Sequence, residues 1–174
     1  MVFYQDKEIL IRSMQERDAR TIADCELLQG YHVSAEKYRM RLRHQKEGKA
    51  AALVAEYRGE AAGYIHVYWR ETTGAFAAAG YPEIVDFSVL LKFRRKGIGS
   101  RLMDAAEALA AQHSDTVYLG VGLHSGYGSA QRMYIKRGYI PDGSGVWYKD
   151  RVCEPYGQCR NDDDLILYLS KKLK

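Results

Sequence analysis

The stretch Val85-Asp86-Phe87-Ser88-Val89-Leu90-Leu91-Lys92-Phe93-Arg94-Arg95-Lys96-Gly97-Ile98-Gly99-Ser100 decides the fold, because a strand pattern runs directly into a basic, glycine-containing loop. Residues 83–90 are a continuous run of β-type residues, and a helix with one apolar side is predicted from Gly99 to about His113. Gly97 and Gly99 allow the backbone to approach an anion closely, and the start of a helix carries about half a positive charge. The pattern therefore indicates either a site for a phosphorylated ligand or a plain tight turn between the strand and the helix.

The remaining sequence predicts elements in the order β-α-α-β-β-β-α-β-α-β-β. The strands are expected at residues 9–11, 50–57, 61–69, 83–90, 116–123, 147–148 and 165–169, and the helices at 18–30, 34–47, 99–113 and 129–137, with a loop at 71–82. Asp18 and Ser34 are the expected caps of the first two helices. Because strands outnumber helices and hairpins mix with crossovers, the pattern favours an α/β (α+β) fold. We expect a single domain over residues 1–174, with a mixed, mostly antiparallel sheet of about six to seven strands and about four helices.

Composition narrows the class of protein. The chain has 174 residues, 47% of them hydrophobic and 28% charged, with a net charge of +4, which is typical of a globular protein rather than a disordered one. No stretch approaches the ~20 apolar residues of a membrane span, and Asp6, Lys7 and Glu8 stand where a signal peptide needs an apolar core. We expect a cytoplasmic protein. The basic stretch 37–49 is interpreted as a solvated helix surface rather than a nucleic-acid interface.

The cysteines indicate a reducing compartment. Cys25, Cys153 and Cys159 are an odd number in a chain without a signal peptide, which predicts free thiols with structural roles. No residue pattern has the spacing of metal ligands, so no metal is expected.

Two common phosphate-binding motifs do not fit the loop. A P-loop needs Lys after its second Gly, and Ser100 follows Gly99. The dinucleotide fingerprint needs a third Gly where Leu102 stands. By contrast, Arg94-x-x-Gly97-x-Gly99 between a strand and a helix resembles the acyl-coenzyme A signature of the GNAT N-acetyltransferases.

A second segment carries the same resemblance. Residues 130–139, from Ala130 through Tyr134 to Gly138 and Tyr139, resemble the family's Ala-x-x-apolar-Tyr-x-x-x-Gly-aromatic segment. The predicted order of elements also matches the family, so the resemblance covers about residues 8–170. The sequence departs from the family at Tyr127, where an Asn that contacts the coenzyme is frequent.

The resemblance implies an acetyl-coenzyme A-dependent N-acetyltransferase in which a primary amine attacks the thioester directly. It implies that a backbone N–H near Val89 polarises the acetyl carbonyl, that Tyr134 is the general acid, and that Glu83, Asp86 or a water molecule takes the proton of the amine. The coenzyme-binding residues that it implies are Ser88, Val89, Leu90, Arg94, Arg95, Lys96, Gly97, Ile98, Gly99, Ser100 and Ala130.

The acceptor and the partners follow less directly. A small-molecule or peptide amine is the expected acceptor, a homodimer is a further expectation, and neither a membrane nor a nucleic acid is expected as a partner. The alternative suggested by Tyr127 is a catalytically silent acyl-coenzyme A-binding or regulatory module. His66, Tyr68 and Trp69 are interpreted as packing residues, and residues 161–164 as a solvated acidic turn.

Overall fold

The structure is a computed structural model that describes residues 1–70 and 73–173, so residues 71 and 72 of the predicted 71–82 loop lie outside the described part. The chain divides into two compact units. The first, unit 1, contains residues 1–68 and 84–109, and the second, unit 2, contains residues 69–83 and 110–174. Each unit has its own strands and its own packed side chains.

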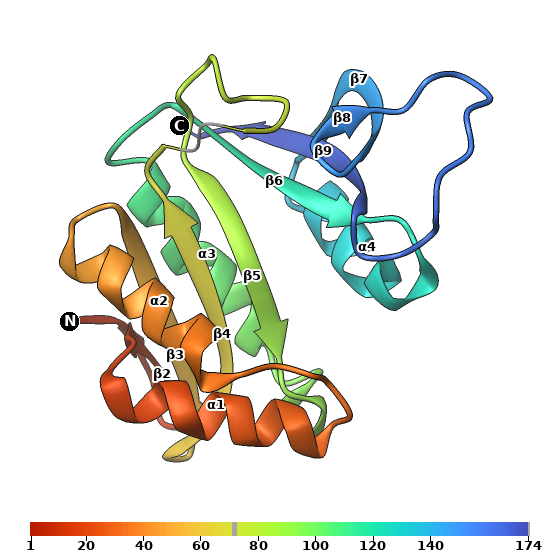
Figure 1. The fold of residues 1–174 in the computed structure, drawn as a ribbon. Coiled ribbons are helices and arrows are strands. Elements are labelled where there is room, and N and C mark those ends of the chain that lie inside the picture. The colour runs from red at the N-terminus through yellow and green to blue at the C-terminus, as the bar shows by residue number, and fades with distance from the viewer. Residues whose placement is uncertain (71–72, 174) are drawn as a thin grey trace. The chain divides into compact units, whose positions relative to one another are not determined.

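Unit 1 contains a twisted sheet with the strand order β1-β2-β3-β4-β5 (Figure 1). The strands are β1 (Val2–Gln5), β2 (Ile9–Ser13), β3 (Ala50–Tyr57), β4 (Glu60–Tyr68) and β5 (Glu83–Val89), the first residue of which belongs to unit 2. β1 to β4 pair antiparallel, and the Arg58-Gly59 turn joins β3 to β4 in a tight hairpin. Both residues of that turn have positive φ, as a two-residue hairpin with the right-handed sheet twist requires.

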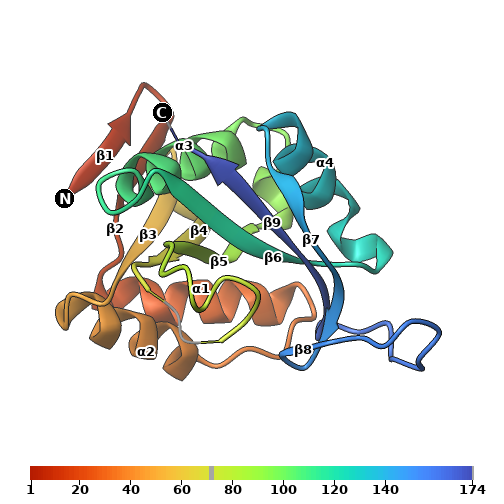
Figure 2. The same cartoon turned by 90° about the horizontal axis from the view of Figure 1, so that it is seen from above.

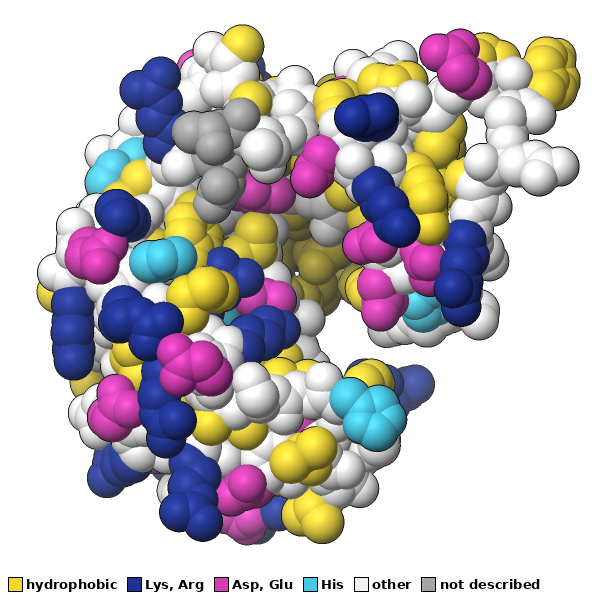
Figure 3. Space-filling model, in the orientation of Figure 1, with side chains coloured by type: hydrophobic (Ala, Val, Ile, Leu, Met, Phe, Trp, Pro, Cys, Tyr) yellow, Lys and Arg dark blue, Asp and Glu magenta, His cyan; other side chains and the backbone are white. Residues whose placement is uncertain are grey.

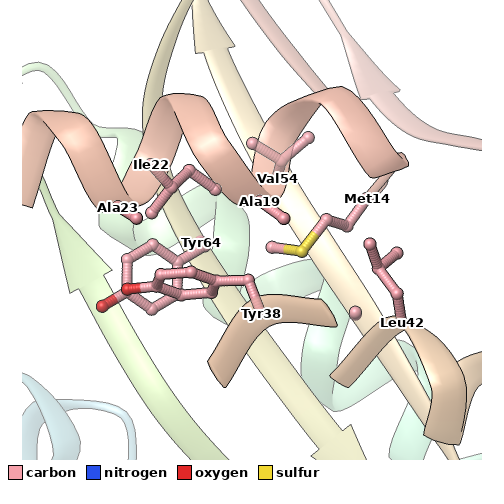
Figure 4. Close-up of a cluster of buried hydrophobic side chains, with 9 residues drawn as sticks. Met14, Ala19, Ile22, Ala23, Tyr38, Leu42, Val54 and Tyr64 are labelled. Carbon is pink, nitrogen blue, oxygen red and sulfur yellow. The ribbon is translucent and has the colours of Figure 1, made fainter. Parts of the chain in front are cut away.

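Helices cover both faces of this sheet. α1 (Glu16–Leu28) and α2 (Ala35–Lys46) lie on one face and α3 (Ile98–Ala110) on the other (Figure 2). Figure 4 shows side chains of α1 and α2 packed on those of β3 and β4. The buried cluster contains Met14, Ala19, Ile22, Ala23, Tyr38, Leu42, Ala52, Val54 and Tyr64. Burying such a side chain contributes roughly 1.5–3 kcal/mol, which explains why two short helices hold their place on the sheet.

A buried carboxylate fixes how α1 and α2 sit on β4. Glu26 of α1 is 4% exposed and accepts hydrogen bonds from Tyr64 of β4 at 2.6 Å and from Tyr38 of α2. Burial raises the pKa of both phenols, and their bonds to Glu26 add to the effect. Because a buried carboxylate without donors is very costly, the two hydroxyls select one rotation of each helix.

Unit 2 contains four strands in the order β6-β9-β7-β8, all paired antiparallel. They are β6 (Thr116–Gly122), β7 (Ile140–Tyr148), β8 (Arg151–Val152) and β9 (Leu165–Lys172), and α4 (Gly128–Lys136) lies on one face of them. On the other face, Phe76 contacts the rings of Tyr118 and Tyr168, with the centroids 4.8 and 6.5 Å apart. Tilted and edge-on aromatic contacts therefore hold the described part of the 71–82 loop on this sheet.

The predicted α/β class with four helices is confirmed, but the described residues form nine strands rather than six to seven. The two short strands β1 and β8 were not predicted, and each lies at a sheet edge. The expected cap of the first helix was wrong: α1 begins after Gln15, and Asp18 accepts a hydrogen bond from the Gln15 backbone N–H at 2.7 Å. Ser34 does precede α2 as predicted. The single domain stays a prediction.

Candidate functional site

The junction between β5 and α3 has the geometry of an anion cradle. A short 3-10 helix, Leu91–Phe93, follows β5, and the chain then turns through residues 94–97 into α3. Leu90 is anchored by its N–H to the carbonyl of Ala62 on β4 at 2.9 Å, and Phe93 is buried at 5% exposure. The first amides of α3 have no helical carbonyl to bind, so they point out of the helix start with its partial positive charge. The cradle thus has a rigid strand on one side and free donors on the other.

The two glycines of the loop serve different purposes. Gly97 has φ +79°, a conformation that side chains disfavour, and it lets the chain turn into the helix. Gly99 is needed for closeness, because a Cβ there would lie 3.2 Å from the ring of Phe87 on β5. The predicted role of the glycines, close approach of the backbone to an anion, stays a prediction.

Three consecutive cations line the loop, and their surroundings differ. Arg94 donates to the carbonyl of Val89 at 3.2 Å, and Lys96 lies over the ring of Tyr57 at 4.9 Å. Arg95 is exposed and adopts φ +64°, and among the described residues no ion pair or hydrogen bond to its side chain is found. Arg95 thus combines a strained backbone with a guanidinium that has no ion-pair or hydrogen-bond partner among the described residues, and such a residue is well suited to bind a ligand.

Asp86, one of the two predicted bases, is locked in an ion-pair cluster on β5. It accepts a hydrogen bond from Arg41 Nε at 2.8 Å and pairs with Lys37 Nζ at 2.8 Å, and both cations come from α2. Burial alone would raise the pKa of Asp86, but the charges of Lys37 and Arg41 outweigh it and lower that pKa. The carboxylate therefore stays ionised and is a weak proton acceptor at neutral pH.

The same cluster extends along β4 to aromatic side chains. Arg41 Nη1 donates to the hydroxyl of Tyr68 at 2.6 Å, and His44 Nδ1 lies 2.6 Å from that oxygen. His66 is fully buried, with its Nδ1 3.8 Å from Asp86, and burial lowers its pKa to about 3. His66 is thus neutral at pH 7, as expected of a packing residue.

Sequence reasoning missed the cations of this cluster. The stretch 37–49 was interpreted as a solvated surface, and Figure 3 shows the Lys and Arg side chains of α2 mixed with acidic ones. Arg39 and Arg43 are indeed exposed, at 46% and 55%. Arg41 is only 19% exposed, because it turns inward to Asp86. The available signal was Tyr38, Leu42 and Arg41 on adjacent positions of a single helix face.

Glu83, the other predicted base, has a different environment. It accepts a hydrogen bond from the hydroxyl of Tyr118 at 3.2 Å, and both residues belong to unit 2. The neutral hydroxyl of Tyr118 therefore contacts Glu83, whereas two cations contact Asp86.

Tyr134, the predicted acid, lies on α4 in unit 2 and is 6% exposed. Its burial raises its pKa, and the neighbouring Tyr127 adds to the effect. The phenol is therefore protonated at neutral pH, the state that a proton donor requires. Ala130, one helical turn earlier, is partly buried.

Tyr127, which replaces the frequent Asn, has a structural role. Its hydroxyl donates to Asp163 at 2.8 Å, and His124 Nε2 lies 3.0 Å from the same carboxylate oxygen. Gly122 leaves room for the ring, since a Cβ there would lie 2.4 Å from it. The bonds to His124 and then Tyr127 lower the pKa of Asp163. The acidic segment was interpreted as a solvated turn, and Asp163 is indeed exposed, while its carboxylate also contacts Tyr127 and His124 of this loop.

The predicted residues divide between the units. Asp86 and the set from Ser88 to Ser100 lie in unit 1, whereas Glu83, Ala130 and Tyr134 lie in unit 2. Trp69 stacks on His113 at 4.0 Å, which agrees with a packing role. Within residues 1–70 and 73–173, no three His, Cys, Asp or Glu side chains are grouped to hold a metal ion. None of the helices described is long and apolar enough to cross a membrane.

Known structures share this fold. The chain is similar to the acetyl transferase that modifies the N-terminal serine of ribosomal protein L7/L12 from Salmonella typhimurium, with TM-score 0.74, 11% identity and full coverage (100%) of both chains. It is similar to Ard1 from Thermoplasma volcanium, with TM-score 0.70, 20% identity and coverage of 96% of this chain and 99% of that one. It also resembles yncA of Salmonella typhimurium, solved with acetyl-CoA, with TM-score 0.68, 17% identity and coverage of 97% and 95%.

No curated protein sequence matches the chain significantly. The family model "Acetyltransferase (GNAT) family" matches residues 17–139, which include both the 94–99 loop and the 130–139 segment. The match spans more than half of the chain and covers the anion cradle described above. The chain therefore belongs to the GNAT family of acetyltransferases, whose members move an acetyl group from acetyl-CoA to an amine.

Proposed function

We propose that this N-acetyltransferase works by direct transfer, with the coenzyme held at the β5–α3 junction and the reaction carried out by Glu83 and Tyr134. The observation that carries the proposal is the cradle itself: free amides at the start of α3, glycines at 97 and 99, and three adjacent cations. These groups fit a pyrophosphate, because its oxygens accept several hydrogen bonds within a small space and its negative charge is attracted by the adjacent cations.

The end of β5 is the proposed position for the reacting carbonyl. Acetyl-CoA supplies the thioester, and the backbone N–H near Val89 would donate to the carbonyl oxygen as charge develops on it. Close packing supports a fixed position for this strand end. A Cβ on Gly63 of β4 would lie only 2.7 Å from the carbonyl oxygen of Ser88, so the two strands approach more closely than larger residues allow.

We infer that Glu83, rather than Asp86, takes the proton from the acceptor ammonium, directly or through a water molecule. Two cations hold the pKa of Asp86 low, whereas a neutral phenol contacts Glu83. Asp86 then acts as a positioning residue that ties β5 to α2. An amine must lose its proton before it attacks, so the base should control the acidic limb of the pH–rate profile.

Tyr134 is the proposed donor to the departing thiolate. Burial, which raises its pKa, keeps the phenol protonated, so Tyr134 has a proton to offer to the leaving sulfur. We further propose that the acceptor is a primary amine of a peptide or small molecule. The relative described as modifying an N-terminal serine makes peptide α-amines the first group to screen.

The deciding experiment is a calorimetric titration with acetyl-CoA, with NADH as the control ligand, followed by thiol-release assays on peptide α-amines, lysine side chains and small amines. Saturable binding of acetyl-CoA alone, together with turnover on one class of amine, supports the proposal. Binding without turnover on any of these amines would favour the silent module instead. The absence of binding would refute the cradle. Light scattering of the same sample tests the expected homodimer, and fractionation of the native cell tests the expected cytoplasmic location.

A further inference from the structure

Two cysteines meet beside the short hairpin of β7 and β8. Cys153 directly follows β8, and five residues separate it from Cys159. Both cysteines line a single cavity of about 270 Å³, together with Tyr148, Arg151 and Gln158. The pair is therefore part of a formed site and not a chance proximity in sequence.

The backbone between the cysteines is folded into a tight turn. The N–H of Cys153 donates to the carbonyl of Val146 on β7 at 2.7 Å, which fixes the start of the segment. The N–H of Gly157 donates to the carbonyl of Glu154 at 2.9 Å. A Cβ on Gly157 would lie 2.9 Å from that same oxygen, so this tight form of the turn needs glycine. The turn returns the chain so that both cysteines line the same cavity.

The pair is accessible and lies outside the part of the sequence that matches the acetyltransferase family. Cys159 is exposed and Cys153 is half-buried, and both are free thiols. They lie outside residues 17–139, the part that matches the acetyltransferase family. Cys25, the third cysteine, lies on α1 in unit 1. The acetyltransferase reaction therefore gives no reason for two thiols in one cavity here.

We propose that Cys153 and Cys159 form a dithiol site that a peroxide oxidises reversibly to an intramolecular disulfide. In the first step the Cys159 sulfur attacks one oxygen of hydrogen peroxide, the O–O bond breaks, and a sulfenic acid and one water molecule form. In the second step the Cys153 sulfur attacks the sulfenic sulfur, the S–S bond forms, and the second water molecule leaves with the Cys153 proton. Two thiols and one peroxide thus give one disulfide and two waters.

The two sulfurs have different roles because their surroundings differ. Cys159 is open to solvent, where a dissolved peroxide can reach its sulfur. Burial and the bond to Cys159 raise the pKa of Cys153, which keeps it as the thiol. The exposed sulfur therefore meets the oxidant and the half-buried one resolves the intermediate.

Peptide mapping tests the proposal directly. Trypsin cleaves after Arg151 and Arg160, so both cysteines stay on one peptide, residues 152–160. The reduced full-length protein is treated with one equivalent of hydrogen peroxide, alkylated and digested with trypsin, and the peptide masses are measured by mass spectrometry. We expect this peptide to lose both alkylation sites and to be lighter than the reduced, unalkylated peptide by two hydrogen atoms. Cys25 should remain alkylated, and dithiothreitol should restore both sites.

Three variants sharpen the result. Cys25→Ser is the matched control and should close the disulfide as the wild type does. Cys153→Ser should accumulate a sulfenic acid at residue 159 that dimedone traps. Gly157→Ala keeps both thiols but disturbs the turn, so closure should be slower than in the wild type. The proposal is overturned if the wild-type peptide keeps two alkylated cysteines, if the disulfide is intermolecular or includes Cys25, or if Gly157→Ala closes as fast as the wild type.

Discussion

Replacing Arg95 separates the backbone strain of the coenzyme loop from its charge. Arg95 adopts φ +64° at the turn into α3. For a residue with a side chain this left-handed conformation costs about 1–2 kcal/mol, whereas glycine adopts it freely. Glycine also has more conformational entropy than alanine in the unfolded chain, which stabilises the unfolded state by about 0.4–1 kcal/mol and offsets part of the relief of strain. Arg95→Gly should therefore be more stable than Arg95→Ala by about 1 kcal/mol, which for a chain of this length is a Tm difference of about 3 °C.

Both variants lose the guanidinium and so should bind acetyl-CoA equally weakly. We expect a Kd about fivefold higher than in the wild type, the effect of about 1 kcal/mol for an exposed charge on a phosphate. The salt dependence of binding should fall as well, since one screened contact is gone. Calorimetric titration gives the Kd, and scanning calorimetry gives the Tm of the same samples.

The comparison with dephospho-coenzyme A shows which phosphate Arg95 meets. Dephospho-coenzyme A lacks the 3′-phosphate. If Arg95→Ala binds dephospho-coenzyme A with the wild-type Kd, the lost contact is with the 3′-phosphate. If the Kd of dephospho-coenzyme A rises as much as that of acetyl-CoA, the contact is with the pyrophosphate. An Arg95→Gly protein less stable than Arg95→Ala would refute the strain argument. Wild-type affinity in both variants would refute the charge argument.

Four further predictions concern the strands and the reacting groups. Tyr134→Phe should lower kcat by about 10²-fold or more while the Kd of acetyl-CoA stays within about twofold, as stopped-flow and calorimetry would show; unchanged kcat would exclude it as the acid. Glu83→Gln should abolish the acidic limb of the pH–kcat/KM profile, and an intact limb would point to another base. Asp86→Asn should destabilise unit 1 by about 2 kcal/mol in urea, because two half-buried cations lose their partner. The pKa of Asp86 is lowered in the folded protein, so its carboxylate stabilises the fold fully above the unfolded pKa of 3.8. The difference in unfolding free energy between the wild type and Asp86→Asn should therefore disappear as pH falls from 3.8 through the lower pKa of the folded state. Gly63→Val should unfold unit 1 at lower urea, since its Cβ would meet the Ser88 carbonyl at 2.7 Å; equal stability would mean that the strands can separate there.

Local patterns predicted the centre of the fold well. The strand, the glycine loop and the helix over residues 83–110 were predicted within a few residues, because the periodicity and the glycines act within one segment. β3 matched its predicted range of 50–57, since it carries the run of apolar residues of a buried strand. β1 and β8 were missed because edge strands bury little: β8 has two residues and both are exposed.

Contacts between residues that lie far apart in the chain could not be predicted from the local sequence pattern. Arg41 meets Asp86 across 45 positions, and Tyr127 meets Asp163 across 36. The position of Arg41 beside Tyr38 and Leu42 indicates that it lies near the buried face of α2, but the local pattern does not identify Asp86 as its partner. Likewise the different surroundings of Glu83 and Asp86 depend on partners from other elements, so the sequence left the choice of base open.

The cradle at the start of α3 presents backbone amides rather than side chains to an anion, and this has a consequence for drug resistance. An inhibitor that competes by placing a phosphate-like group on these amides would contact atoms that every amino acid carries. Point mutations of Arg94 or Lys96 would leave those atoms in place. Escape would have to come through Gly97 or Gly99, where a side chain would disturb the turn or press on Phe87 and impair coenzyme binding as well.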